Sequence, residues 1–452
     1  MKPTLQLALD FVNLSQALRV AREAAQAGDI WLEVGTPLIK SEGIEAIRKL
    51  RVEFPAHTLV ADMKIMDAGR VEVEMAAKAG ADVVAVLGAA SSATIAECIE
   101  AGRHYDAQIM VDLAEVADPV KRAREVEELG AGIVGVHCPI DVQMRGETPL
   151  DTLRTVAAAV SIPVAVAGGI NSETAPQAVA AGASIVIVGG AISKAPDAKV
   201  ATQTILEAMA TGQAAETSLY KRVTLEGVRE ALLRCTTAHI SDAMHRGGRL
   251  PGIMPIQPGL KCVGPAFTVW TYPGDWHRPV TAIDQAAEGD VLVIDVRGEP
   301  PAVWGEQATQ SCLQRKLAGV VIHGAMRDSA GIRRLGYPAF CSLVTMAAGD
   351  PKGVGLIGVP LRIGETAVRP GDWIVGDDDG VICIPKERVV EVANRALSVV
   401  ERESRELAEI EAGSTLGEVG ELRRWGQQRR EQAREEGEEQ SDSPEPPEEE
   451  TA

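Results

Sequence analysis

The stretch Val60-Ala61-Asp62-Met63-Lys64-Ile65-Met66-Asp67 places two carboxylates around a lysine at the end of an apolar run. Side chains alternate faces along a β-strand, so a strand here would direct Asp62 and Lys64 to the same side. Asp67 would then fall in the loop that follows. Buried charges are costly unless each has a partner. The stretch therefore predicts either a structural salt bridge or a functional site at the end of a strand.

Short apolar runs alternate with amphipathic segments through the first half of the chain, in units of about 25 residues. The apolar runs, which we expect to be strands, are 5–10, 30–34, 58–64, 82–87, 108–113, 132–137, 163–167 and 184–188. The segments with helical periodicity are 14–27, 44–54, 71–79, 94–104, 120–129, 150–160, 172–181 and 198–210. Strands that are apolar on both faces are typical of a parallel sheet covered by helices. Eight such units predict an α/β fold, a (βα)8 TIM barrel, with a doubly wound sheet as the alternative.

Polar residues stand where these predicted strands end, which is where functional groups lie in a barrel. Along the chain they are Asp10, Glu33, Asp62 with Lys64, Asp112 and His137, followed by the pairs Gly168-Gly169 and Gly189-Gly190. Glycines at the seventh and eighth strands allow backbone N–H groups to approach a phosphate, although tight turns with positive φ also require them. The pattern predicts one site at the mouth of the barrel, with an anion seat formed by the glycines.

Several motifs resemble those of one enzyme family. They are Glu33-Val34-Gly35-Thr36-Pro37-Leu38-Ile39-Lys40, residues 61–69, Val86-Leu87-Gly88, Val111-Asp112-Leu113, residues 165–169 and residues 188–192. Together they resemble the 3-hexulose-6-phosphate synthases, which belong to the orotidine-monophosphate-decarboxylase-like barrels, and the resemblance covers about residues 1–212. It implies aldol condensation of formaldehyde with the sugar phosphate D-ribulose 5-phosphate to D-arabino-hex-3-ulose 6-phosphate, or the reverse. That reaction belongs to the ribulose monophosphate pathway and requires Mg²⁺, for which Mn²⁺ is a substitute.

The resemblance also assigns roles to the acidic residues and the lysine. Glu33 and Asp62 are implied as metal ligands, which suits the preference of Mg²⁺ for hard oxygen donors. Lys64 would donate to the oxyanion of an ene-diolate, a role in which charged hydrogen-bond donors are effective. Asp62 and Asp67 would keep its ammonium charged, and family members bring the equivalent of Asp67 from a second subunit. A dimeric barrel is therefore implied.

His137 is the predicted general base for the C1 proton, because histidine titrates nearest neutral pH. The alternative is a core histidine bonded to a carbonyl group. Asp10 and Asp112 are expected to orient substrate hydroxyls or to tune the lysine. The related 3-keto-L-gulonate-6-phosphate decarboxylase shares the ene-diolate and is the alternative function. We expect a basic residue in its phosphate turn, whereas Gly189-Gly190-Ala191 contains none.

The 25-residue rhythm stops near residue 212, and five of the six tryptophans lie beyond it. We expect a barrel over 1–212, a linker over 213–218, a mixed α/β domain of the swivelling type over 219–415 and a disordered acidic tail over 416–452. The elements expected in the second domain are helices over 219–234 and 387–412 and strands over 267–272, 291–296, 320–322, 338–342 and 381–384.

The second domain contains a strand, a loop that opens a helix at Gly305-Glu306-Gln307-Ala308, and a second strand that ends at Arg327-Asp328. This pattern predicts a seat for a carboxylate and a metal. It resembles the family of regulators of ribonuclease E activity and class II 4-hydroxy-4-methyl-2-oxoglutarate aldolases, over about residues 218–390. The resemblance implies that Arg327 binds a pyruvate-containing oxo-acid, that Asp328 holds the metal and that the domain forms trimers. His323 departs from the aspartate more often found there, so a silent, partner-binding module is the alternative.

The composition limits the functions and locations that are possible for the protein. The net charge is −19, and residues 435–452 carry nine acidic residues and no Lys or Arg. This balance argues against nucleic-acid binding. The sequence contains no apolar run of 18 residues, so we expect no membrane span. The cysteines, at 98, 138, 235, 262, 312, 341 and 383, lack metal-ligand spacing and predict reduced core residues of a cytoplasmic protein. The two family resemblances imply that the protein is a homo-oligomer.

Overall fold

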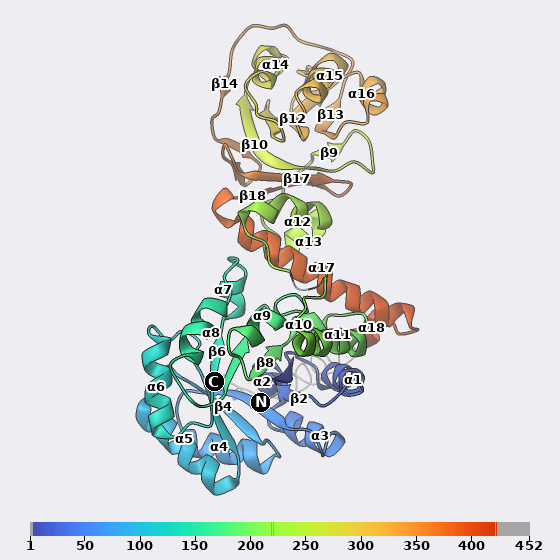
Figure 1. Cartoon of the computed structure of the whole chain (residues 1–452). Helices are drawn as coiled ribbons and strands as arrows, with labels where there is room; N and C mark the ends of the chain where they lie inside the picture. Colours follow the sequence, from blue (N-terminus) through green and yellow to red (C-terminus); the bar gives the residue numbers. More distant parts are fainter. Residues whose placement is uncertain (1–2, 218, 220, 421, 423–452) are drawn as a thin grey trace, which may run out of the picture.

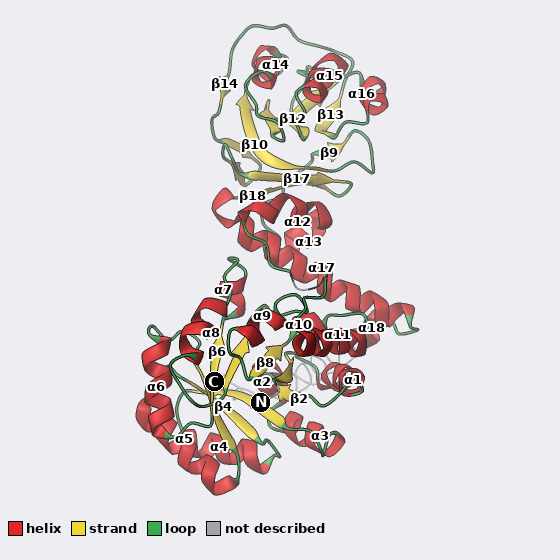
Figure 2. Ribbon diagram, viewed as in Figure 1, coloured by secondary structure: helices red, strands yellow, loops and turns green. Residues whose placement is uncertain are grey.

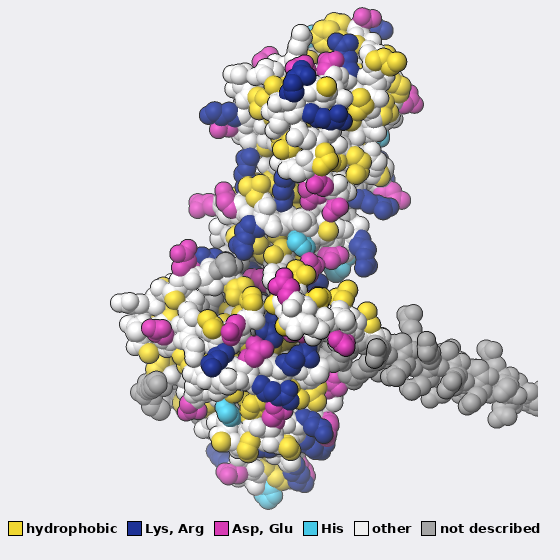
Figure 3. Space-filling view, turned by 90° about the vertical axis from the view of Figure 1, so that its right-hand side faces the viewer, with side chains coloured by type: hydrophobic (Ala, Val, Ile, Leu, Met, Phe, Trp, Pro, Cys, Tyr) yellow, Lys and Arg dark blue, Asp and Glu magenta, His cyan; other side chains and the backbone are white. Residues whose placement is uncertain are grey.

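The computed structural model describes residues 3–217, 219, 221–420 and 422. A barrel formed by the first half of the chain carries a second α/β domain, and one long helix, α17 (Val389–Glu411), runs between the two (Figure 1). On the face shown in Figure 3, acidic and basic side chains are interspersed over both domains. Within the described part of the chain, no helix has the length and apolar character needed to cross a membrane.

Eight strands form a closed parallel barrel in the order of the sequence, which confirms the predicted barrel and excludes the doubly wound sheet. The strands are β1 (Thr4–Leu9), β2 (Trp31–Val34), β3 (Leu59–Ile65), β4 (Val83–Leu87), β5 (Gln108–Asp112), β6 (Ile133–His137), β7 (Val164–Ala167) and β8 (Ile185–Val188). Their apolar side chains pack outward against helices, while a smaller cluster that includes Val60, Met110 and Ile133 fills the interior. The carboxyl ends of all eight strands therefore meet at one mouth.

Eight helices cover the barrel much as the periodicity predicts (Figure 2). They are α1 (Leu14–Ala25), α3 (Glu45–Glu53), α4 (Gly69–Lys78), α5 (Ser92–Tyr105), α6 (Pro119–Leu129), α8 (Leu150–Ala157), α9 (Ala175–Ala180) and α11 (Ala198–Thr211). Three shorter helices were not expected, namely α2 (Thr36–Glu42), α7 (Ile140–Gln143) and α10 (Gly190–Ser193). Each follows a strand end directly and is too short to show helical periodicity in the sequence.

The second domain is built on a mixed sheet with the strand order β18-β17-β10-β11-β12-β13-β9, and β14 pairs with β10. The strands are β9 (Met254–Pro255), β10 (Cys262–Trp270), β11 (Val291–Asp295), β12 (Gly319–Met326), β13 (Ala339–Val344), β14 (Leu356–Ile357), β17 (Trp373–Asp377) and β18 (Gly380–Ile384), with a separate hairpin of β15 (Leu361–Ile363) and β16 (Thr366–Val368). This confirms a mixed α/β domain.

Two groups of helices pack on this sheet (Figure 1). The first group is α14 (His277–Ile283), α15 (Glu306–Gln314) and α16 (Ser329–Leu335), and the second is α12 (Val228–Arg234), α13 (Thr237–Ala243) and α17. The predicted helix over 219–234 is wrong at the described residues 221–224, which are not helical and precede the 3₁₀ turn η1 (Leu225–Gly227). Upstream of it, Val223 exchanges hydrogen bonds with the side chain of Asn394 on α17, which holds the segment out of a helix.

The end of the second domain returns to the barrel. A short 3₁₀ turn, η2 (Lys386–Arg388), leads into α17, and α18 (Leu416–Val419) follows α17. Val419 is buried, and its carbonyl accepts a hydrogen bond from Gln16 of α1 at 2.8 Å. The predicted disordered tail is therefore wrong over its first residues, because packing of Val419 on the barrel orders them. Residues 421 and 423–452 lie outside the described part.

Candidate active site

A cavity of about 580 Å³ opens at the mouth of the barrel. Its lining includes most of the predicted site residues, namely Asp10, Glu33, Asp62, Lys64, His137, Gly168, Gly169, Gly189 and Gly190. They come from the ends of strands far apart in the sequence. Closure of the sheet brings these ends together, as expected for a barrel of this kind.

Lys64 lies between two carboxylates. Its Nζ is 3.1 Å from Oδ1 of Asp62 and 3.0 Å from Oδ2 of Asp112. Burial alone would lower the pKa of Lys64, but the two carboxylates outweigh burial and raise the pKa above its usual value. Lys64 is therefore charged at neutral pH. The backbone at Lys64 is irregular. The pairing of β3 with β4 is interrupted between Ala61 and Ile65, and Lys64 has a φ of 47°, which is unusual for a residue other than glycine.

Asp112 also joins Lys64 to His137. Oδ2 of Asp112 lies 2.9 Å from Nδ1 of His137, and its Oδ1 accepts a hydrogen bond from the Ala114 backbone N–H. Burial raises the pKa of Asp112, but His137, Lys64 and that N–H together lower it below its usual range. An ionised Asp112 favours the proton on Nδ1, which leaves Nε2 of His137 able to accept one. The geometry does not support the alternative of a histidine bonded to a carbonyl group, because the partner of Nδ1 is the Asp112 carboxylate.

The opposite side of the cavity is acidic. Glu33 is buried, and its Oε2 accepts a hydrogen bond from Nε2 of Gln6. Burial, together with the negative charges of Asp62 and Asp10, raises the pKa of Glu33 well above its usual value. The pKa of Asp10 is also raised, by surrounding protein atoms and by Asp62, although Asp10 is accessible from the open cavity. Burial and neighbouring carboxylates therefore oppose the ionisation of both Glu33 and Asp10.

The glycines allow close approach of the backbone. Gly168 has a φ of 112°, and a Cβ on it would lie 2.5 Å from the carbonyl oxygen of Cys138. A Cβ on Gly35 would lie 2.2 Å from Oδ1 of Asp10. Side chains at these positions would displace the loop after His137 or the Asp10 carboxylate. Gly168 and Gly169 both have a positive φ, whereas Gly189 does not, and the anion seat at these glycines stays a prediction.

Asp67 is the one predicted residue of the barrel site that lies apart from this cluster. It is exposed, and its Oδ1 accepts a hydrogen bond from the backbone N–H of Ala68. Within one chain, Asp112 therefore takes the place beside Lys64 that was expected for Asp67, because Asp67 lies beyond the end of β3. Its contribution to a second subunit stays a prediction.

Several residues in or beside the cavity were not predicted as site residues. Thr36, at the start of α2, donates to Oδ2 of Asp62 at 2.7 Å, and Gln6 orients Glu33. Lys194, after α10, and Ser398, on α17, also line the cavity. Gln6 could have been recognised from the sequence, because it is a polar residue inside the apolar run 5–9. Nothing in the sequence links Lys194 with Ser398, which lies 204 residues further along the chain.

The second domain has a cavity of about 650 Å³, lined by all the residues predicted there, namely Gly305, Glu306, Gln307, Ala308, Arg327 and Asp328. Asp328 has a φ of 57°, and its Oδ2 is 3.3 Å from the backbone N–H of Glu306. Nε of Arg327 is 3.6 Å from the same oxygen, and both side chains are partly exposed. Nδ1 of His323 pairs with Asp295 at 2.7 Å instead of facing this cavity.

Comparison with known proteins assigns the barrel to a family. The model of the orotidine 5'-phosphate decarboxylase / HUMPS family matches residues 3–205. The 3-hexulose-6-phosphate synthase of Staphylococcus haemolyticus (strain JCSC1435) is 43% identical over 194 residues, which are 43% of this chain and 92% of that protein. Through its barrel, the chain belongs to this family. The synthase-like barrel is also 39% identical, over 194 residues, to the 3-hexulose-6-phosphate synthase of Bacillus subtilis (strain 168), again 43% of this chain and 92% of the relative.

Two further findings complete the comparison. A crystal structure of 3-hexulose-6-phosphate synthase from Salmonella typhimurium is 37% identical and covers 46% of this chain and all of that one, with a TM-score of 0.45. The model of the RraA-like family, described as Aldolase/RraA, matches residues 237–383. The chain is therefore a fusion of a synthase-like barrel with an RraA-like aldolase domain, which confirms both resemblances.

Proposed function

We propose that the barrel is a 3-hexulose-6-phosphate synthase that condenses formaldehyde with D-ribulose 5-phosphate to D-arabino-hex-3-ulose 6-phosphate, or catalyses the reverse cleavage. One observation carries this proposal. Lys64, Asp62, Asp112 and His137 form a connected network of polar contacts at the barrel mouth, where all of them except Asp112 line the cavity. The identity of 43% to a synthase supports it.

The residues fit the proton and charge transfers of this reaction. Nε2 of His137 takes a proton from C1 of the ketose, and negative charge develops on the adjacent oxygens. The Lys64 ammonium stabilises that charge, and Asp112 holds both groups in place. The C1 carbon then forms a bond to the carbon of formaldehyde. The formaldehyde oxygen, now an alkoxide, takes the proton held on Nε2 of His137, so the cycle ends with His137 as it began.

The acidic side of the cavity fits a divalent cation. Burial and the charges of Asp62 and Asp10 raise the pKa of Glu33, and a nearby positive charge would favour its ionised form. Carboxylate oxygens are also the ligands that Mg²⁺ prefers. Glu33 and Asp62 would hold the ion, and when bound it would supply Lewis-acid stabilisation of the negative charge. Among the described residues, no group of three His, Cys, Asp or Glu side chains is arranged to hold a metal. Two protein carboxylates suit an ion that keeps positions for water and substrate.

Replacement of Glu33 by glutamine provides a test of this acidic pair. Because burial and Asp62 oppose ionisation of Glu33, Glu33→Gln should raise the free energy of unfolding at neutral pH by about 1 kcal/mol. It should also weaken Mg²⁺ binding by at least about tenfold, or 1.4 kcal/mol. Denaturant unfolding and calorimetric titration with Mg²⁺ measure the two effects.

Glu100→Gln, on the exposed surface of α5, is the matched control and should change neither quantity. Unchanged Mg²⁺ affinity in Glu33→Gln would contradict the assignment of Glu33 as a ligand.

For the second domain we propose a lyase acting on a pyruvate-containing oxo-acid, with Arg327 on the carboxylate and Asp328 as a metal ligand. The position of both residues in one cavity beside the start of α15 supports this. A bidentate arginine suits a carboxylate, and an aspartate suits a divalent ion. A cytoplasmic homo-oligomer, with the barrel as a dimer and this domain as a trimer, is part of the same proposal.

The test is magnesium-dependent pyruvate release from 4-hydroxy-4-methyl-2-oxoglutarate by the full chain. Asp328→Ala should lower this release by about 10²-fold or more, because it removes the proposed protein ligand of the ion. Asp284→Ala, on the exposed end of α14, serves as the control and should keep full activity. Absence of pyruvate release from the unmodified chain would instead favour a non-catalytic binding module.

A further inference from the structure

The cavity of the barrel is not formed by the barrel alone. Its lining residues all come from the first half of the chain except for Ser398, which lies on α17 of the second domain. The N-terminal part of α17 packs in the core of the second domain, where Val389, Val392 and Leu397 are buried. One helix therefore belongs both to the second core and to the wall of the first cavity.

Ser398 contacts a lysine at the glycine end of this cavity. Nζ of Lys194 donates to Oγ of Ser398 at 2.6 Å, and Oε2 of Glu401, one turn further along α17, lies 3.9 Å from the same Nζ. Lys194 directly follows α10, which begins at Gly190. The ammonium is thus held by the second domain beside the glycine pair of the eighth strand.

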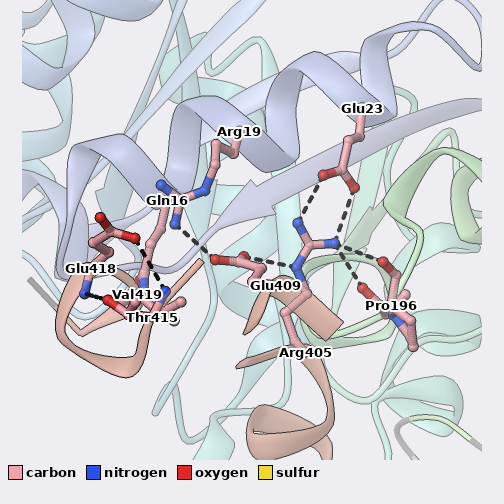
Figure 4. A network of polar contacts seen from close by, with 10 residues as sticks. Gln16, Arg19, Glu23, Pro196, Arg405, Glu409, Thr415, Glu418 and Val419 are labelled. Carbon is pink, nitrogen blue, oxygen red and sulfur yellow. Dashed lines mark hydrogen bonds and ion pairs between the residues drawn. The ribbon is translucent and has the colours of Figure 1, made fainter. Parts of the chain in front are cut away.

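Two loops at the barrel mouth are attached to the same helix. Asn394, which is fully buried, donates to the carbonyl of Met144 at 2.9 Å, in the loop that follows His137. Arg405 donates to the carbonyls of Ala195 and Pro196 at 3.1 Å, directly after Lys194. Arg405 also pairs with Glu23 of α1 (Figure 4), so this part of α17 is anchored to the barrel.

We propose that α17 and the barrel together form an interdomain anion subsite, in which Lys194, positioned by Ser398 and Glu401, binds the phosphate group of the barrel's substrate. This inference rests on the proposed function, because it names the residue that receives the phosphate of the ketose. The fusion would therefore affect phosphate binding, because a barrel without α17 would lack the groups that position Lys194.

The charges at the cavity support Lys194 over the other lysines that line it. Lys64 is already paired with two carboxylates, and Lys40 is exposed on α2. Burial lowers the pKa of Lys194 to about 8, against the opposing effect of Glu401. A bound phosphate would offset that cost of burial, because an opposite charge favours the charged form of an amine.

The test uses the full chain with Lys194→Ala and Ser398→Ala, and with Lys199→Ala on α11 as the matched control. We expect Lys194→Ala to raise KM for ribulose 5-phosphate at least about tenfold and to weaken binding of inorganic phosphate similarly, with a much smaller change in kcat. Ser398→Ala should raise KM for ribulose 5-phosphate and the dissociation constant for inorganic phosphate about threefold. Ser398→Thr, which keeps the hydroxyl group, should leave both constants as they are in the unmodified chain. Lys199→Ala should match the unmodified chain.

The phosphate titration, followed by calorimetry, separates this inference from the proposed reaction. If the chain condenses no formaldehyde but loses phosphate affinity in Lys194→Ala, the proposed function fails and the subsite stands. Unchanged KM and phosphate affinity in Lys194→Ala, in a chain that catalyses condensation, would overturn the subsite alone. Failure of the unmodified chain to bind inorganic phosphate would also overturn it.

Discussion

Replacement of Lys64 by alanine is expected to lower kcat for condensation by about 10³-fold or more. Loss of one preorganised donor to a developing oxyanion costs roughly 10²- to 10³-fold in other enzymes. Here the same ammonium also separates the carboxylates of Asp62 and Asp112, whose mutual repulsion is then unscreened. The measurement is the initial rate of hexulose phosphate formation at saturating ribulose 5-phosphate and formaldehyde.

Two companion variants make this result interpretable. Lys64→Met keeps the apolar part of the side chain and should lose as much activity as Lys64→Ala, provided that circular dichroism shows the fold intact. Lys78→Ala removes an exposed lysine of α4 that contacts Glu74 and the ring of Tyr105, away from the cavity, and it should keep full activity. Turnover of Lys64→Met within tenfold of the unmodified chain would contradict the role of the ammonium.

Asp112→Asn is expected to lower kcat by about 10³- to 10⁴-fold with a small change in KM. The carboxylate accepts hydrogen bonds from both Lys64 and His137, and an amide cannot hold both with the same oxygen charge. An amide NH₂ facing Nδ1 of His137 also favours the tautomer with its proton on Nε2, which cannot act as a base. The corresponding substitution in serine proteases, where the same tautomer argument applies, costs about 10⁴-fold.

Asp112 also makes a prediction about stability and pH. Its pKa is lowered in the folded state, so ionised Asp112 stabilises the fold above the unfolded-state value near 3.8. That contribution should be lost as the pH falls below this value toward the folded-state pKa. The difference in free energy of unfolding between the unmodified chain and Asp112→Asn should therefore be largest at neutral pH and shrink under acid conditions. A difference that grows as the pH falls would contradict the ion pairs.

The sequence was sufficient to predict the barrel because each unit repeats the same signal. Eight apolar strands that alternate with amphipathic helices leave few other folds. The ends of the strands could be located from the sequence for the same reason. Asp10, Glu33, Asp62 and Lys64 could therefore be placed at one mouth of the barrel. The short α2, α7 and α10 escaped prediction because a helix of four to seven residues has too few turns to show periodicity.

What could not be predicted depends on contacts between distant parts of the chain. Asp62 and Asp67 were expected to hold the ammonium of Lys64, and the contact with Asp62 is present, whereas the second carboxylate in the chain is Asp112, which barrel closure brings from β5. The ordered start of the tail depends on a docking position for Val419 on α1, which no local pattern encodes. The contribution of Ser398 likewise requires the second domain to be placed on the barrel.

The most direct test of this account is a condensation assay with the full chain, ribulose 5-phosphate, formaldehyde and Mg²⁺. The account predicts formaldehyde-dependent formation of hexulose 6-phosphate that disappears with chelation of the metal and in Lys64→Ala. If the chain forms no hexulose phosphate, and instead releases CO₂ from 3-keto-L-gulonate 6-phosphate, the barrel is a decarboxylase and the central claim is wrong.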